Sequence, residues 1–269
     1  MAANDASKRE MFEHYALDRR AARIPNFRLE MLDDLTRYDP TGSDDEAILC
    51  FARLQPADAE RRIGEELDRL RAHSWAAEWK VHEFDEPPDL KQRLEARGLA
   101  CHHVEALMVL PVGDAPVRST SRGDATVEQA SGSTLDEMAA LQEEIWQCRL
   151  PWLAPGLREM THPERGTGLA FCARVGGRIV GTGWIDFLGG SPFAQLSGGS
   201  VHAEFRGRGI YSMMFERRVE AARARGIPYL AVDAAPMSRP ILERKGFRYI
   251  CDTYPMRTRP FDTSAVTRS

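Results

Sequence analysis

The first half of the chain contains apolar positions with two different spacings. Apolar runs at 47–54 and 103–112 and an alternating run at 78–84 predict three strands. Through 57–73 apolar residues recur every three or four positions among charged ones, which predicts an amphipathic helix. A second helix is expected over 89–98, where a glycine closes it. The predicted order is therefore strand, helix, strand, helix, strand.

The same order of elements returns in the second half of the chain. The predicted elements are strand 194–202, helix 210–225, strand 229–233, helix 239–245 and strand 248–256. The junctions RLEARGLA at 93–100 and ILERKGFR at 241–248 are alike, which indicates an internal structural repeat. We therefore expect a mixed α/β fold with two related halves, 1–115 and 125–260, joined by small and polar residues within 111–132.

Glycine pairs predict two local features of the second half. Strand-like runs at 169–175 and 178–187 flank one Gly-Gly pair, which is a strong signal for a two-residue hairpin. A second pair, Gly198-Gly199, lies inside the predicted strand 194–202. Glycines within a strand indicate a bulge or a close approach of the backbone to another group.

Three further expectations concern burial. The polar N-terminal stretch is expected to carry only a surface helix over 7–20. For Trp146 and Trp152, burial in the core is favoured over a place beside a substrate. The arginines of the predicted helix 210–225 are interleaved with glutamates, which favours a solvated face over a nucleic-acid surface.

Composition describes a globular protein without a strong field of either sign. The chain has 269 residues, 43% apolar and 28% charged, with a net charge of −4, so neither nucleic acid nor an anionic membrane is an expected partner. The five cysteines are scattered without metal-ligand spacing, so we expect reduced thiols and no bound metal. The polar N-terminus does not have the pattern of a signal peptide, and no apolar run reaches 18 residues, so a cytoplasmic location is expected.

The stretch 201–212, VHAEFRGRGIYS, joins a predicted strand to a predicted helix and contains the best candidate for a binding site. The first-turn amides of a helix lack intrahelical partners, and the helix dipole favours an anion there. Gly207 and Gly209 allow close approach of the backbone and positive φ angles, while Arg206 and Arg208 add charge that suits phosphate oxygens.

This stretch resembles the pyrophosphate loop of the GNAT superfamily of N-acetyltransferases. The family pattern is Gln or Arg, two residues, Gly, one residue, then Gly or Ala; Arg206 and Gly209 match it, and Tyr211 departs from it at the last position. The next strand, 228–233, and the closing helix with its Gly-Phe ending, 238–247, are also similar to the family. The resemblance covers about half of the chain. The sequence also resembles a bacterial subgroup of the family that has an extra N-terminal half.

The resemblance implies the GNAT acyl-CoA N-acyltransferase fold and acetyl-CoA as co-substrate, with no metal. It places the cofactor at the residues Ser200, Val201, His202, Arg206, Gly207, Arg208, Gly209, Ile210, Tyr211 and Ser212. A backbone N–H near Ser200 and Val201 would serve the thioester oxygen. The reaction implied is direct attack of a primary amine in a ternary complex, without a covalent enzyme intermediate.

The catalytic residues are less clearly indicated. The candidates are Asp233, Glu144, Asp186 and Tyr254. The three carboxylates are candidate general bases. Many family members use a tyrosine of the last helix as general acid, but Leu242 occupies that position and Ala235 replaces the accompanying asparagine, which leaves Tyr211 or Tyr254.

Two functions are compatible with the sequence. One is an acetyltransferase acting on a small-molecule amine or an exposed amino group, as a monomer or homodimer. The other is a non-catalytic acyl-CoA-binding sensor or interaction module, because the usual tyrosine is missing. In the first half, residues 55–58 (QPAD) place a carboxylate where the second half has its arginines, so that half is expected to be degenerate and to lack the cofactor.

Overall fold

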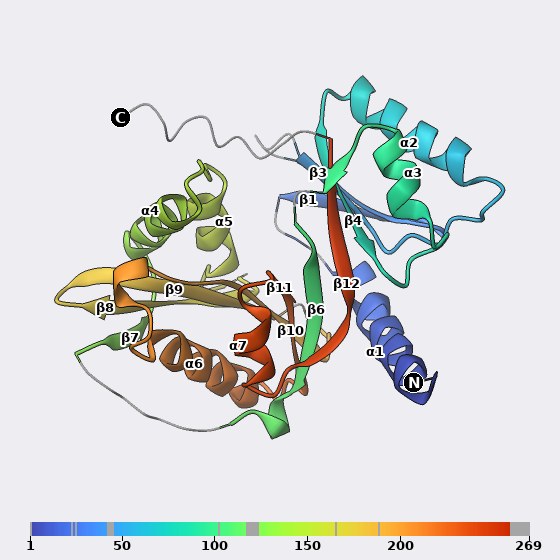
Figure 1. Cartoon of the computed structure of the whole chain (residues 1–269). Coiled ribbons are helices and arrows are strands. Elements are labelled where there is room, and N and C mark those ends of the chain that lie inside the picture. The colour runs from blue at the N-terminus through green and yellow to red at the C-terminus, as the bar shows by residue number, and fades with distance from the viewer. Residues whose placement is uncertain are drawn as a thin grey trace. The chain divides into compact units, whose positions relative to one another are not determined.

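The computed structural model describes residues 2–258, except residues 23, 25, 42–45, 102, 117–123, 165 and 188. Within this part the chain divides into two units (Figure 1). Unit 1 comprises 2–109 and 233–258, and unit 2 comprises 110–232. The chain therefore enters unit 1 twice, and the residues that complete it come from the C-terminal end of the described sequence.

Unit 1 is built on a mixed sheet. Its elements are α1 (Ala2–Arg20), β1 (Phe27–Met31), β2 (Thr36–Pro40), β3 (Glu46–Cys50), α2 (Ala59–Ala72), β4 (Ala76–His82), α3 (Leu90–Ala96), β5 (Ala100–Cys101), most of β6 (Glu105–Pro111), α7 (Arg239–Glu243) and β12 (Arg248–Arg257). The strand order is β1-β2-β3-β4-β12-β6, with β5 also paired to β12. β3 and β4 are parallel, whereas β12 runs antiparallel to both β4 and β6.

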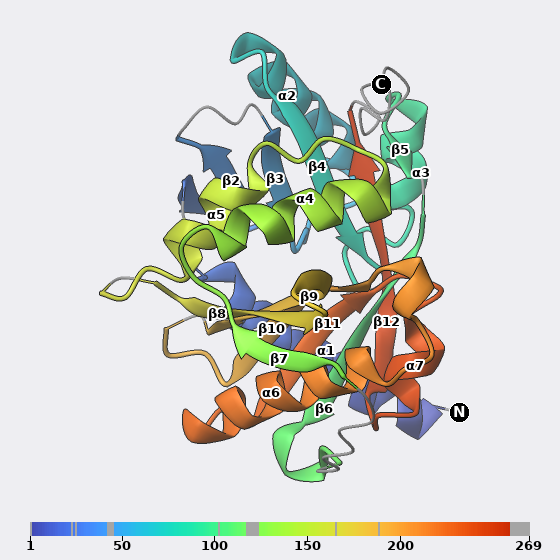
Figure 2. The ribbon, with the colours of Figure 1, turned by 90° about the vertical axis from the view of Figure 1, so that its left-hand side faces the viewer.

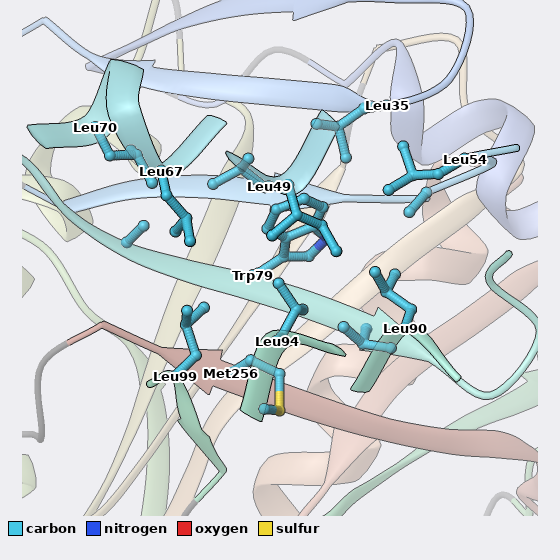
Figure 3. Packing of buried hydrophobic residues seen from close by; sticks show 14 of the residues in the cluster. Leu35, Leu49, Leu54, Leu67, Leu70, Trp79, Leu90, Leu94, Leu99 and Met256 are labelled. Carbon is cyan, nitrogen blue, oxygen red and sulfur yellow. The ribbon is translucent and has the colours of Figure 1, made fainter. Parts of the chain in front are cut away.

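The core of unit 1 surrounds Trp79 of β4, which is fully buried (Figure 3). Leucines from α2, α3 and β3 pack around its ring, and so does Met256 of β12. The alternating burial along β4 and β12 explains why these sequences form central strands, since each contributes apolar side chains to this core.

Unit 2 contains the strands β7 to β11 and the helices beside them. Its elements are η1 (Val112–Asp114), β7 (Thr126–Gln129), α4 (Thr134–Trp146), α5 (Leu153–Met160), β8 (Gly168–Val175), β9 (Arg178–Phe187), β10 (Phe193–Val201), η2 (Ala203–Phe205), α6 (Ile210–Ala224) and most of β11 (Tyr229–Ala234). The strand order is β11-β10-β9-β8-β7, antiparallel except for the parallel pair β10–β11.

Two helices cover one face of this sheet and one covers the other (Figure 2). α4 and α5 form a core with Ala170, Cys172 and Ile179, while Ile210 and Met214 of α6 pack on Ala173, Val180 and Val201. Consecutive residues of β8 and β9 therefore point to opposite faces, as the period of a strand requires. These observations confirm the predicted mixed α/β fold.

Several local predictions are confirmed and others are wrong. The hairpin between β8 and β9 turns at Gly176 and Gly177, with φ angles of +55° and +85°. Strands β1 and β2 were not predicted, and α1 is not confined to the surface, because Phe12 is fully buried. Trp146 and Trp152 were expected in the core but are 53% and 47% exposed.

Candidate active site

The parallel strands β10 and β11 separate near their carboxyl ends. Their pairing covers three residue pairs and ends at Gln195 and Ala231. From Leu196 onwards β10 is paired only to β9 on its other side. The edge of β10 that faces away from β9 therefore leaves backbone N–H and C=O groups available to a ligand.

β10 is bulged within this separated stretch. Ser197 pairs with Trp184 and Ser200 pairs with Thr182, so two residues of β10 lie opposite the single residue Gly183. Gly198 has a φ angle of +59°, and a Cβ atom there would lie 1.7 Å from the ring of Trp184. The bulge predicted from the Gly-Gly pair is confirmed, and glycine is required both by backbone conformation and by the tryptophan.

A buried glutamine of α4 holds this bulge. Gln142 Nε2 donates to the Gly198 carbonyl (2.8 Å) and to Thr182 Oγ1 (2.5 Å), and Thr182 Oγ1 donates to the same carbonyl (3.0 Å). Gln142 Oε1 accepts from the indole of Trp146 (2.8 Å). Both Gln142 and Thr182 are buried, and buried polar groups with all partners present fix one geometry. Sequence reasoning missed them because a glutamine within a mostly apolar helix face has no motif.

The predicted phosphate loop follows the bulge directly. Gly207 and Gly209 have φ angles of +75° and +80°, and Gly209 is the N-cap residue of α6. Apart from the adjacent residues, no atom of the described part of the chain lies within 4 Å of where a Cβ atom would be at either glycine. The space in front of the loop is therefore open, and the first turn of α6 presents its amides to it. The residues present fit a pyrophosphate group.

The two arginines of the loop are exposed and anchored by their own neighbours. Arg206 Nε donates to the Val201 carbonyl (3.1 Å), which ties the loop back to the end of β10. Arg208 donates to the Glu204 carbonyl (3.2 Å), and its guanidinium lies 4.9 Å from the centre of the Phe205 ring. Both arginines thus belong to the segment that directly precedes α6, whose N-terminus favours an anion.

One of the predicted catalytic carboxylates contacts the predicted cofactor loop. His202 Nδ1 accepts from the Glu204 N–H (3.4 Å), and its Nε2 lies 3.1 Å from Glu144 Oε1, within hydrogen-bond distance. The Glu144 side chain is 55% exposed, and Arg178 lies 3.7 Å from the same oxygen. The structure therefore brings Glu144 of α4 together with the end of β10.

The other carboxylate and tyrosine candidates occupy different places. Asp186 lies on β9 opposite Gln195 of β10, in unit 2. Asp233 belongs to unit 1, where Lys80 Nζ lies 2.6 Å from its Oδ2. Burial alone raises the pKa of Asp233, but the charge and hydrogen bond of Lys80 outweigh this and hold that pKa below its usual value. Tyr254 also belongs to unit 1, and burial raises its pKa.

The arginines of α6 do not form one solvated face. Arg217 is half-exposed and pairs with Glu220 (3.2 Å), as expected. Arg223 donates to the carbonyls of Val112 and Ala115. Arg218 is only 1% exposed, so the prediction of a solvated face is wrong for this residue. The sequence signal that could have revealed it is the set of glycines in β9 and β10, which leave room for its side chain.

The part of the chain that the structure describes has neither a metal-binding cluster nor a membrane-spanning helix. No group of three or more His, Cys, Asp or Glu side chains lies close enough together to hold a metal ion. Among the same residues, no helix has the length and apolar character needed to cross a membrane.

Comparison with known proteins identifies the domain that contains this site. Residues 136–247 match the model of the acetyltransferase (GNAT) family, and this range includes most of α4, the bulge, the loop and α6. The sequence resemblance to this family is therefore confirmed for the domain.

Solved structures are similar over most of the chain. A GCN5-related N-acetyltransferase from Kribbella flavida has a TM-score of 0.70 and 14% identity, over 90% of this chain and 93% of that one. A GCN5-related N-acetyltransferase from Sphaerobacter thermophilus has a TM-score of 0.60 and 16% identity, over 84% and 78%. A tandem GNAT protein from the clavulanic acid biosynthesis pathway has a TM-score of 0.57 and 15% identity, over 90% and 86%. At these identities the likeness is one of fold.

Proposed function

Because residues 136–247 match the model of the acetyltransferase (GNAT) family, we propose that this protein transfers an acetyl group from acetyl-CoA to the primary amine of a small molecule or an exposed amino group. The observation that carries the proposal is one continuous piece of backbone. The separated edge of β10, its bulge and the loop at the start of α6 follow one another within residues 196–210.

Each part of this backbone supports one requirement of acyl transfer. The loop residues Arg206 to Ser212 would hold the pyrophosphate of acetyl-CoA through amides and two arginines. A backbone N–H of β10 near Ser200 and Val201, on the edge that β11 leaves open, would stabilise charge on the thioester oxygen. The bound acetyl-CoA supplies an activated acyl group, and the enzyme gains rate chiefly by bringing amine and thioester together.

The chain also offers groups for proton removal from the amine. Glu144, in contact with His202, lies beside the end of β10 and remains half-exposed, so it can exchange protons with solvent. We assign Glu144 as the first candidate base. Asp233 is a weaker proton acceptor, because a carboxylate with a lowered pKa binds protons less readily. We also propose that the first half of the chain is degenerate and does not bind the cofactor.

The test is unfolding with and without acetyl-CoA for the wild type, Gly209→Glu and Gly226→Glu. Gly226 lies beyond the other end of α6 and has a φ angle of +66° and open space around it, so Gly226→Glu introduces the same strain and charge away from the loop. Acetyl-CoA at 100 times its dissociation constant should stabilise the wild type and Gly226→Glu by about 2.7 kcal/mol. Gly209→Glu should show no gain, because its carboxylate occupies the anion site.

The outcomes separate three readings. If acetyl-CoA stabilises all three proteins, the cofactor does not bind at the loop. If acetyl-CoA stabilises none of them, the protein does not bind acetyl-CoA. A gain confined to the wild type and Gly226→Glu, followed by release of free coenzyme A with an amine from a panel, establishes the transferase. The same gain without turnover of any amine would favour the acyl-CoA-binding sensor.

A further inference from the structure

A buried arginine of unit 2 lies directly beneath the β10 bulge. Arg218 projects from α6 and is 1% exposed, and no carboxylate of the described residues forms an ion pair with it. Its Nε donates to the Met214 carbonyl (3.2 Å), but its Nη2 is buried without a hydrogen-bond partner among those residues. A fully buried guanidinium with an unsatisfied donor is costly to fold, so its presence calls for an explanation.

Glycines of two strands make the space for this guanidinium. A Cβ atom at Gly183 of β9 would lie 3.1 Å from Arg218 Cζ, and one at Gly199 of β10 would lie 3.5 Å from its Nη2. These two glycines are the residues at which β9 and β10 lose register. The side chain of Arg218 therefore points at the bulge from the α6 face of the sheet.

Tyr211 is the other polar side chain at this place. The guanidinium lies 5.9 Å from the centre of the Tyr211 ring, whose edge would be 3.0 Å from a Cβ atom at Gly199. Burial lowers the pKa of Arg218, and the charge interaction and hydrogen bond with Tyr211 oppose that change. A guanidinium stays protonated in proteins even when buried, so a positive charge is retained below the bulge.

We propose that Arg218 is a positioning residue for acyl transfer, whose buried charge polarises the β10 bulge and so stabilises the negative charge that develops at the thioester bound along it. This rests on the proposed function. During the reaction the amine nitrogen bonds to the acetyl carbon, and the carbon–sulfur bond breaks with its electron pair leaving on sulfur. The amine proton passes to a base or to water. Negative charge develops first on the thioester oxygen and then on the sulfur, and both atoms would lie beside the bulge. In a protein interior without water, a fixed cation nearby stabilises such a charge strongly.

The decisive measurement is the infrared carbonyl stretch of bound acetyl-CoA, labelled with ¹³C at the thioester carbon. We compare the wild type, Arg218→Met, which removes the charge but keeps an unbranched side chain, and Arg218→Lys, which restores a charge. The matched control is Arg217→Met, because Arg217 is adjacent in sequence, half-exposed and paired with Glu220.

A positive charge near the bulge lowers the stretching frequency of the carbonyl. We expect the low frequency in the wild type and Arg217→Met, a return toward the frequency of free acetyl-CoA in Arg218→Met, and recovery in Arg218→Lys. With an amine acceptor, kcat of Arg218→Met should fall roughly 10²-fold while acetyl-CoA affinity is kept. Its Tm should equal or exceed that of the wild type, because the unpaired charge is gone.

Identical carbonyl frequencies in the wild type and Arg218→Met, with acetyl-CoA bound to both, would overturn the inference and leave the proposed function standing. If acetyl-CoA stabilises no variant, the proposed function itself fails. Should Arg218→Met not fold, Arg218→Gln keeps a hydrogen-bonding group without the charge and is measured in the same way.

Discussion

Two buried polar side chains of unit 2 differ in how many of their hydrogen-bonding groups have a partner. Gln142 reaches the Gly198 carbonyl, the Thr182 hydroxyl and the Trp146 indole, so its amide is fully used. Arg218, on the opposite face of the same bulge, has no carboxylate partner among the described residues and an unsatisfied Nη2. Complete satisfaction indicates a structural role, whereas a buried charge without its partner is typical of a functional site.

At the same scale, the Lys80–Asp233 pair of unit 1 predicts a stability effect. Asp233→Asn leaves a mostly buried ammonium beside a neutral amide, with Glu105 as its next carboxylate at 4.0 Å. We expect a loss of about 2–3 kcal/mol in the free energy of unfolding, measured with urea at neutral pH. Asp68→Asn is the control, since Asp68 is exposed beside Arg71 on α2 and should change stability by less than about 0.5 kcal/mol.

The sign of the pH dependence follows from the lowered pKa of Asp233. Its folded value lies below the unfolded one, so the pair stabilises the protein above the unfolded pKa, and this contribution is lost as pH falls through the folded pKa. The stability difference between the wild type and Asp233→Asn should therefore shrink on acidification below about pH 4. A difference that is constant from neutral to acidic pH would show that the pair is not responsible.

At the scale of elements, spacing and glycine patterns predicted most of the second half. The hairpin, the bulge and α6 could be found because their sequences satisfy local rules: a Gly-Gly turn, glycines inside a strand, and a glycine N-cap. β1 and β2 were missed because their sequences, FRLEM and TRYDP, carry charged residues that local pattern assigns to loops. Asp39 is buried in β2 only because Arg69 and Arg28 pair with it, a long-range effect that no local pattern shows.

The geometry of the bulge predicts that a substitution at Gly198 destabilises the protein, both through backbone strain and through a clash. Gly198→Ala forces a left-handed backbone onto alanine and places a methyl group within the ring of Trp184. We expect a loss of roughly 2–4 kcal/mol in the free energy of unfolding. Gly189→Ala, at a glycine with no atom near a Cβ and no positive φ, should be nearly neutral. Equal midpoints for the two variants in urea unfolding would contradict this account of the bulge.

At the scale of the whole molecule, the sequence predicted the order of most strands and helices but not how the chain distributes them between the two units. Residues 233–258 form part of unit 1 together with residues 2–109. The alternation of hydrophobic residues predicts a strand over 248–256. Which strands pair with it depends on register and on the shape of the core, and both are set by residues far away in the sequence. The place of Met256 beside Trp79 is a property of the folded unit alone.

This arrangement predicts the effect of shortening the chain. A chain ending at Phe247 lacks β12, so β4 and β6 lose their common antiparallel neighbour and the core around Trp79 loses Met256. Because the stability of a domain is only about 5–15 kcal/mol, we expect unit 1 to unfold. A chain ending at Thr258 is the reference, since it keeps every described strand and the hydrogen bonds of Thr258 with Ala77. Hydrogen exchange should show the β4 amides protected in the reference and unprotected in the shorter chain. Equal protection in both would mean that residues 1–109 hold their sheet without the C-terminal strand.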